Sequence, residues 1–395
     1  MSNSEKRPIS DRLWTKAAML HIPLTAAFEL LPVCNLHCKM CYVRKSMDEV
    51  NKMGGLLDGK QWLEYAREAY DLGLLYPLLT GGEPFLHPDF REIMAGIQEM
   101  GMQLSINSNA TMIDRETAVW LGKHVPTRIN ITLYGASEQS YQELCGDGNA
   151  YGKVRNAVQW LKENGVPVKF NTSITPQNVG DLEKIISYAK EVGSPIQVAT
   201  YMFPPIRRDE TMIGKNERLS PEQAGLARVK ADLLQNEPAW FLGQAESFRN
   251  FVPVTEEILE NSEKKSLRMA CRAGNSSLWI DWQGNLSNCG MYGSVKLSLK
   301  KQSLADAWKE MVKKTAAIQY TPACAACPNI QLCHPCIAMV SNECGDINGR
   351  PEYLCRMNQA AAHYYQEYAR LLAEGYEPAE AVNVPAVWIK SDYDE

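Results

Sequence analysis

The spacing of the cysteines constrains this 395-residue chain more than any other feature of its sequence. Three cysteines lie close together at positions 34, 38 and 41, and eight more lie between 271 and 355. Disulfide scaffolds are typical of short secreted chains, whereas the polar segment from Met1 to Ser10 lacks the apolar stretch of a signal peptide. We therefore expect reduced, metal-binding thiols in a cytoplasmic protein.

The rest of the composition is that of an ordinary globular protein. Hydrophobic residues make up 45% of the chain and charged residues 22%, which is enough for a core of normal size. The net charge of −5, without any long run of Lys or Arg, argues against a nucleic-acid platform. No apolar stretch reaches the length of about 18 residues that a membrane span needs. We expect neither nucleic acid nor membrane as a partner.

Short β-rich runs alternate with amphipathic patterns between Ala26 and Tyr201. The expected strands are Ala26–Pro32, Leu74–Leu79, Gln103–Asn107, Arg128–Leu133, Val166–Thr172 and Ile196–Thr200. The expected helices are Asp58–Tyr70, Pro88–Met100, Asp114–His124, Tyr151–Asn164 and Val179–Val192. This alternation indicates parallel strands joined by helical crossovers. The fold class we expect is α/β, a partial (β/α)6 TIM-like barrel with a small cysteine-rich C-terminal domain.

The chain divides into five segments on this interpretation. They are an N-terminal segment 1–25, the barrel 26–202, bridging helices 203–270, the cysteine-rich domain 271–357, and a C-terminal helix with an acidic tail 358–395. The bridge contains the basic pair Arg207–Arg208 and two helical stretches, Pro221–Gln235 and Val254–Lys264. Its role is not readable from the sequence. The last helix is expected at Met357–Gly375.

The first cysteine group, Cys34-Asn-Leu-His-Cys38-Lys-Met-Cys41, directly follows the first expected strand. Four-iron clusters normally take four cysteines. Three local thiolates would leave one iron open to another ligand, which is typical of a catalytic rather than a structural metal site. The end of a barrel strand is also where such folds place their chemistry. The alternative is a structural zinc site or a group of reduced thiols.

The CxxxCxxC spacing, followed one β/α unit later by Thr80-Gly81-Gly82-Glu83-Pro84, resembles the radical S-adenosylmethionine (SAM) superfamily. The resemblance implies that Cys34, Cys38 and Cys41 bind the cluster whose open iron holds SAM. It implies that Gly81 and Gly82 let the backbone approach the methionine moiety and that Glu83 accepts a hydrogen bond from its ammonium group. Further SAM contacts are expected from Met40 and Tyr42, which flank the third cysteine, and from Asn107, Ser108, Asn109 and Thr132 at strand ends. The superfamily usually has an aromatic residue where this chain has Met40.

The C-terminal cysteines resemble the SPASM extension of radical SAM enzymes, which holds two auxiliary four-iron clusters. The resemblance implies an outer cluster on Cys324, Cys327, Cys333 and Cys355, and an inner cluster on Cys271, Cys289 and Cys336. The fourth position of the inner cluster is either an open iron or a bond to Cys344. Cys344 could equally be an outer ligand in place of Cys355. In all, three [4Fe–4S] clusters are expected.

Two features of the C-terminal cysteines differ from a simple SPASM pattern. The last two cysteines of the central run, Cys333 and Cys336, are separated by two residues where the extension generally has three. Paired CxxC units are also a zinc signature, so a zinc ribbon is the alternative, although five residues between the pairs are few for a ribbon. Cys145 lies outside both groups and is expected to be a loop thiol, with a radical-quenching hydrogen donor as the less favoured alternative.

The resemblance implies that the enzyme is an oxidoreductase that cleaves SAM reductively to a 5′-deoxyadenosyl radical, which then removes a hydrogen atom from the substrate. Enzymes with this extension mostly resemble modifiers of peptides, so the expected substrate is a ribosomally synthesised peptide or a protein. The expected product carries a thioether or carbon–carbon crosslink or an epimerised residue. Expected partners are an electron donor such as flavodoxin or ferredoxin and, because few residues precede the first strand, a separate leader-binding protein.

Three alternatives to peptide modification remain at this point. Formylglycine formation, as in anaerobic sulfatase maturation, is disfavoured because that group has an acidic residue where this chain has Gly290. Radical dehydrogenation or epimerisation of a small sugar-like metabolite is the second. The third is a non-enzymatic, metal-binding adaptor protein, in which Glu83 and an open three-cysteine site would have no purpose.

Overall fold

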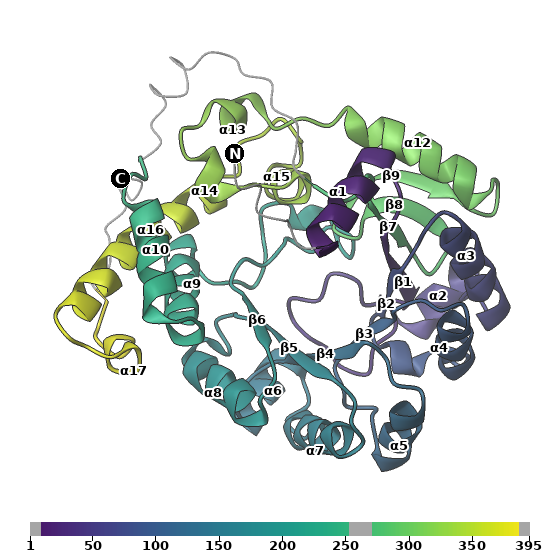
Figure 1. The fold of residues 1–395 in the computed structure, drawn as a ribbon, viewed down its shortest axis with the longest axis horizontal. Coiled ribbons are helices and arrows are strands. Elements are labelled where there is room, and N and C mark those ends of the chain that lie inside the picture. Colours follow the sequence, from purple (N-terminus) through teal and green to yellow (C-terminus); the bar gives the residue numbers. More distant parts are fainter. Residues whose placement is uncertain (1–8, 253–270, 387–395) are drawn as a thin grey trace, which may run out of the picture.

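The computed structural model describes residues 9–252 and 271–386. Six parallel strands follow one another in sequence order, and Figure 1 shows them curving around a central space. They are β1 (Thr25–Leu31), β2 (Tyr76–Gly81), β3 (Ser105–Ser108), β4 (Arg128–Leu133), β5 (Val168–Ser173) and β6 (Ile196–Ala199). The expected partial TIM-like barrel is confirmed, with strand ends shifted by at most two residues.

Helices cover the outer side of the barrel strands (Figure 1). They are α3 (Gly59–Asp71), α4 (Phe90–Glu99), α5 (Arg115–Lys123), α6 (Glu138–Cys145), α7 (Ala150–Glu163) and α8 (Leu182–Val192). Asp58 and Asp114 cap α3 and α5 through their side chains, because an N-cap carboxylate satisfies a backbone N–H that has no partner within the helix. The expected helix 179–192 begins instead as a 3-10 turn, Val179–Asp181 (η2), before α8.

The sheet does not end at β1. A seventh strand, β7 (Ser277–Ile280), pairs parallel with β1, and β8 (Asn285–Cys289) and β9 (Tyr292–Ser298) continue antiparallel from it. The order across the described part of the sheet is therefore β6-β5-β4-β3-β2-β1-β7-β8-β9. The cysteine-rich region thus begins as an extension of the barrel sheet, with Cys289 at the end of β8.

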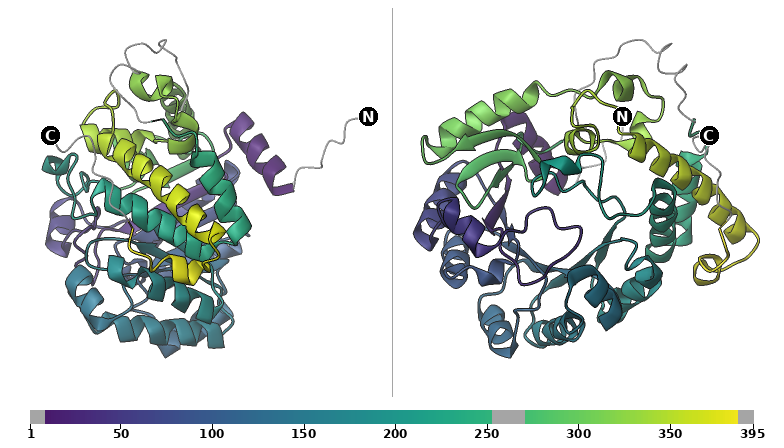
Figure 2. Two further views of the ribbon diagram at one scale, coloured as in Figure 1. Left: turned by 90° about the vertical axis from the view of Figure 1, so that its left-hand side faces the viewer. Right: turned by 180° about the vertical axis from the view of Figure 1, so that it is seen from behind.

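The remaining helices flank the barrel. They are α1 (Ile9–Leu20), α2 (Met47–Lys52), α9 (Pro221–Gln235), α10 (Pro238–Phe248), α12 (Leu304–Ala316), α13 (Pro322–Ala326), α14 (Ile330–Cys333), α15 (Ile337–Cys344), α16 (Glu352–Ala373) and α17 (Pro378–Ala381), with 3-10 turns η1 (Pro84–Leu86) and η3 (Glu210–Met212). Figure 2 shows α9, α10 and α16 side by side, and Phe241, Phe248 and Tyr365 share their core.

Two expectations fall outside the described residues: the helix 254–264 and the acidic tail. Within the residues that are described, the structure contains no helix that is both long and apolar enough to cross a membrane. The expected helix Pro221–Gln235 coincides with α9. The last expected helix is present as α16, but it starts five residues earlier, at Glu352, so that Cys355 lies in its first turn.

Candidate functional site

A cavity of about 380 Å³ lies at the carboxyl ends of the barrel strands. It brings together residues that are far apart in the sequence, and most of the predicted contacts line it. These are Cys34, Cys38, Met40, Cys41, Tyr42, Thr80, Gly81, Gly82, Asn107, Ser108, Asn109 and Thr132. Glu83 and Pro84 do not line the cavity and are buried beneath it. The first cysteine group and the Thr80–Pro84 motif therefore form one site.

The loop that carries the three cysteines is held at its centre by the end of α6. The backbone N–H groups of His37 and Lys39 donate to the carbonyls of Cys145 (2.9 Å) and Leu144 (3.0 Å). Cys145 is itself buried at the last position of α6, and its thiol hydrogen-bonds with Cys38. The expectation that Cys145 is a loop thiol was wrong: α6 is a helix that the sequence analysis did not detect.

The metal-free thiols of the first group differ in acidity. Burial raises the pKa of Cys34 to about 12 and also raises the pKa of Cys41. A hydrogen bond from Cys145 lowers the pKa of Cys38. Because iron binds thiolates, loading of this site must displace protons from Cys34 and Cys41. Three thiols facing one cavity, with no fourth cysteine lining it, fit a cluster that keeps one iron open to a small ligand.

Gly81 and Gly82 are required by contacts within the chain itself. A Cβ on Gly81 would lie 2.3 Å from the Leu31 carbonyl oxygen, and one on Gly82 would lie 2.2 Å from that of Val33. Gly81 also has a φ of 145°, a backbone conformation that residues other than glycine rarely adopt. The backbone N–H of Gly82 donates to the Leu31 carbonyl at 2.7 Å. The two glycines thus press the end of β2 against the segment that leads into Cys34.

Glu83 is fully buried and holds the next strand end. Its carboxylate accepts hydrogen bonds from the hydroxyl of Ser108 (2.9 Å) and the backbone N–H groups of Asn109 (2.8 Å) and Phe85 (3.3 Å). Burial raises its pKa to about 7, although these bonds favour the ionised form. Asn109 in turn directs its side-chain amide to the Cys34 sulfur at 3.5 Å. Glu83 therefore positions a residue that contacts a cluster thiol, and its direct contact with SAM remains a prediction.

The cavity has further lining residues that sequence reasoning missed. They are Leu36, Val43, Tyr134, Ser173, Ala199, Tyr201, Met202, Phe203 and Met291. Tyr134, Ser173 and Ala199 lie at or just after the ends of β4, β5 and β6, so strand-end position was a signal that could have identified them. Met291 comes from the turn between β8 and β9, and no local pattern links that turn to the barrel.

The second cysteine group separates into two sets. In the first set, burial raises the pKa of Cys336, and the charges of Cys289 and Cys271 add to the rise. Cys271 likewise adds to the burial that raises the pKa of Cys289. These three thiols therefore lie within electrostatic range of one another, and their binding of one inner cluster stays a prediction.

The second set contains Cys324, Cys327, Cys333 and Cys355. Burial raises the pKa of Cys333 to about 12 and that of Cys324 to about 11, and in both cases the charge of Cys355 contributes. The charge of Cys344 contributes to the raised pKa of Cys324. It is not among the main causes of the raised pKa values of Cys289 and Cys336. The structure therefore brings Cys344 to the outer set.

No group of three or more described Cys, His, Asp or Glu residues is arranged around the position of a single metal ion. The cysteines of an iron–sulfur cluster bind different irons, so they stand farther apart than the ligands of one ion. The grouping of these thiols around clusters therefore stays a prediction.

Comparison with known proteins agrees with this geometry. Residues 28–189 match the model of the radical SAM superfamily. The AdoMet-dependent heme synthase of Methanosarcina barkeri (strain Fusaro) is 21% identical over 340 residues, which cover 78% of this chain and 92% of that protein. The PqqA peptide cyclase of Granulibacter bethesdensis is 27% identical over 172 residues, covering 44% of this chain and 45% of its own length.

A solved structure shows that the likeness in fold extends beyond the matched domain. Streptococcus suis SuiB bound to its precursor peptide SuiA superposes with a TM-score of 0.63 at 17% identity, covering 90% of this chain and 83% of SuiB. The barrel, the cavity at its strand ends and these matches lead to one assignment. Residues 28–189 of the chain are a radical SAM domain.

Proposed function

We propose that this enzyme carries three [4Fe–4S] clusters, cleaves SAM to a 5′-deoxyadenosyl radical, and modifies a ribosomally synthesised peptide. The observation that carries the first part is the convergence of Cys34, Cys38 and Cys41 with Gly81 and Gly82 in one cavity. A cluster bound there would supply the electron that breaks a C–S bond of SAM. The protein's own residues bind SAM, hold it near the substrate and exclude water.

Most of the predicted SAM contacts have a distinct place in this proposal. Gly81 and Gly82 would present their backbone to the methionine moiety, and Met40 and Tyr42 would contact the adenine. Asn107, Ser108, Asn109 and Thr132 contribute polar groups from the ends of β3 and β4. Glu83 holds Ser108 and Asn109 in position from below.

The two sets of C-terminal cysteines support two auxiliary clusters in a SPASM domain that spans residues 271–357. We assign Cys271, Cys289 and Cys336 to the inner cluster and Cys324, Cys327, Cys333 and Cys355 to the outer one. Cys289 lies at the end of β8, two positions before Met291, which lines the cavity. A cluster held by Cys289 would supply a site that can accept an electron from the reaction.

Peptide modification is supported by the relatives. The PqqA peptide cyclase and SuiB bound to its precursor peptide are both named for peptides. The corresponding reaction here is a thioether or carbon–carbon crosslink or an epimerisation, in the cytoplasm. Electrons would come from a flavodoxin or ferredoxin, and a separate protein would bind the leader segment.

Formylglycine formation ranks behind peptide modification in this proposal. The position after Cys289, where that group of enzymes has an acidic residue, is Gly290. A Cβ at Gly290 would lie 2.5 Å from the ring of Trp279, so no larger side chain fits without displacing that ring. An acidic residue is therefore excluded from this place by packing as well as by sequence.

A porphyrin is the second candidate substrate. The heme synthase of Methanosarcina barkeri aligns over 92% of its length, which is more of the relative than the peptide cyclase match covers. The cavity wall contributed by Met202, Phe203 and Met291 is apolar, and it suits a flat hydrophobic ring as well as a hydrophobic peptide side chain.

The test is anaerobic reconstitution followed by reduction with dithionite in the presence of SAM. We expect 5′-deoxyadenosine from the native chain, about twelve irons per chain on the three-cluster assignment, and no 5′-deoxyadenosine from Cys38→Ala. A metal-binding adaptor would release none from either protein. Candidate peptides from neighbouring reading frames are then compared with an iron coproporphyrin, for which another relative from Methanosarcina barkeri is named, as stimulators of SAM cleavage. Stimulation by the porphyrin alone would reject the peptide.

A further inference from the structure

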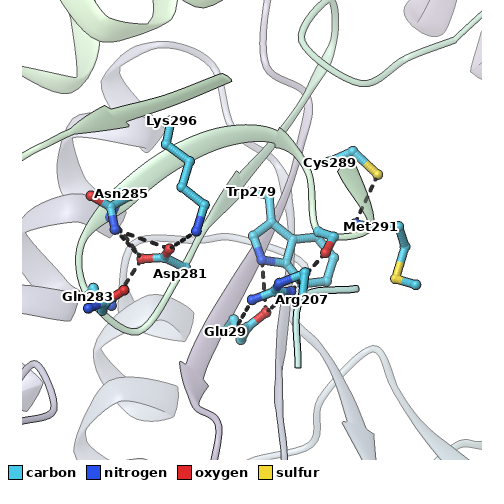
Figure 3. Close-up of polar contacts among 10 residues, drawn as sticks. Glu29, Arg207, Trp279, Asp281, Gln283, Asn285, Cys289, Met291 and Lys296 are labelled. Atoms are coloured by element: carbon cyan, nitrogen blue, oxygen red, sulfur yellow. Dashed lines mark hydrogen bonds and ion pairs between the residues drawn. The ribbon is translucent and has the colours of Figure 1, made fainter. Parts of the chain in front are cut away.

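Arg207, from the basic pair whose role was not readable in the sequence, occupies a partly buried position between the two cysteine regions. Its Nη1 and Nη2 atoms donate to Glu29 Oε2 (2.9 Å) and Oε1 (2.8 Å), which makes a bidentate ion pair (Figure 3). Glu29 lies in β1 and its side chain is 1% exposed. The Glu29 carboxylate is therefore shielded from water, and the Arg207 side chain is 17% exposed. Charges that are largely removed from water interact more strongly than charges at the surface.

The same guanidinium also reaches the cysteine-rich region. Arg207 Nη1 donates to the carbonyl oxygen of Gly290 at 2.8 Å, next to Cys289. The indole N–H of Trp279 donates to Glu29 Oε2 at 3.1 Å (Figure 3). Through these contacts Arg207 fixes the turn that follows Cys289 against strand β1 of the radical SAM domain.

The opposite side of Arg207 faces the first cysteine group. Its guanidinium carbon lies 5.6 Å from the ring centre of Tyr42, which directly follows Cys41. The Glu29–Arg207 pair thus stands between a residue adjacent to Cys41 and one adjacent to Cys289. Fixed charges and hydrogen bonds around a cluster tune its potential.

Stability alone is a weak reason for such a pair. A buried ion pair loses much of its Coulomb energy to desolvation, and apolar residues of similar volume often replace it without loss. A charge pair that contacts the turn beside a cluster ligand has an electrostatic effect that apolar residues cannot supply.

We propose that Glu29 and Arg207 set the reduction potential of the cluster held by Cys289, with Arg207 as the positioning residue of the Cys289–Gly290 turn. This inference rests on the proposed function, because it requires the inner auxiliary cluster. A cluster becomes more negative when it accepts one electron. The guanidinium therefore stabilises the reduced form and raises the potential, and the carboxylate lowers it.

The two charges can be removed separately, and the inference predicts shifts of opposite sign. Glu29→Gln keeps the shape and an acceptor for Arg207 and Trp279, and it should raise the potential. Arg207→Gln should lower it, and Arg207→Lys should restore part of the loss. We expect each Gln variant to change the reduction equilibrium at least ten-fold, which is about 59 mV for a one-electron couple. Arg208→Gln is the matched control, since Arg208 is exposed and its charge acts on Cys41.

The measurement is a redox titration followed by electron paramagnetic resonance on the full chain with Cys34, Cys38 and Cys41 replaced by Ala. In this background only auxiliary iron remains, and the signal lost on further replacement Cys289→Ala identifies the inner cluster. A chain without iron in this background would reject the proposed auxiliary clusters themselves. A loaded inner cluster whose potential is unmoved by both Gln variants, or moved in the same direction by both, would overturn the inference alone. If Arg207→Gln does not fold, the upward shift in Glu29→Gln still decides.

Discussion

Asn109 donates its backbone N–H to the buried carboxylate of Glu83 at 2.8 Å. The side chain of Asn109 meanwhile points to the Cys34 sulfur at 3.5 Å. The end of β2, the end of β3 and the first cluster thiol are therefore joined through two residues. Because Glu83 is fully buried, its ionisation is linked to the stability of this junction.

Glu83→Gln should remove a pH dependence of stability from the metal-free chain. The pKa of Glu83 is raised from 4.5 to about 7 by burial, so the folded state binds this proton more tightly than the unfolded state. The stabilisation is complete below pH 4.5 and is lost as the pH rises to 7, at a cost of roughly 3 kcal/mol. Denaturant titrations of both proteins between pH 4.5 and 7.5 test this, since other groups contribute equally to both. Parallel curves would show that Glu83 has an ordinary pKa.

Gly82→Ala should prevent the first cysteine group from holding its cluster while the barrel stays folded. The added Cβ would lie 2.2 Å from the Val33 carbonyl oxygen, so the segment leading to Cys34 must move. We expect the loss of about four irons per chain, the content of one cluster. Gly152→Ala is the control, because a Cβ there meets nothing within 4 Å in helix α7 and Ala is favoured in helix interiors by about 1 kcal/mol. Full iron content in Gly82→Ala would contradict the close packing of this turn.

The barrel was predictable because each β/α unit carries its own signals. The capping residues Asp58 and Asp114 and the apolar periods of the helices lie within a few residues of one another in the sequence. The first cysteine group and the Thr80–Pro84 motif are equally local, and their positions at the ends of β1 and β2 follow from the order of the strands. Local patterns therefore sufficed for the core of the site.

Features that depend on distant segments were missed. Strand β7 is short, and its partner β1 lies about 250 positions earlier in the chain. No sequence pattern near Ser277 therefore predicts that the two strands pair. Helix α6 is also short, and it follows β4 directly before α7, which breaks the simple alternation of strands and helices. The contacts of Arg207 are of the same kind, because Glu29 and Gly290 are far from it in the sequence.

Cys355→Ala and Cys344→Ala should differ in iron content. The charge of Cys355 contributes to the raised pKa values of Cys324, Cys327 and Cys333. Among these three thiols, the charge of Cys344 contributes only to the pKa of Cys324. We therefore expect Cys355→Ala to lose about four irons and Cys344→Ala to keep them. Iron and sulfide analysis after anaerobic reconstitution measures this. The opposite result would make Cys344 the outer ligand.

The buried pair Arg218–Glu343 should contribute to stability chiefly through coupling between its two members. Arg218 reaches both carboxylate oxygens of Glu343, at 2.5 and 2.9 Å, and its guanidinium lies 3.7 Å from the ring centre of Tyr353. Glu343 precedes Cys344 at the end of α15, and Tyr201 after β6 donates its hydroxyl to the same carboxylate at 2.6 Å. The contacts of Glu343 thus join the cysteine-rich region to Arg218 in the bridging segment and to Tyr201 just after β6.

Removing one partner leaves the other charge buried, so Arg218→Met should destabilise the protein by about 3 kcal/mol or more. The double variant Arg218→Met/Glu343→Met should recover much of this loss, because apolar side chains of similar volume fit where the pair was. Thermal unfolding of the reconstituted single and double variants gives the coupling between the two residues. The exposed pair Arg370–Glu374 serves as the control, where we expect no more than about 0.5 kcal/mol. Additive losses at Arg218 and Glu343 would mean that packing against Tyr353, rather than charge, holds α15 to the barrel.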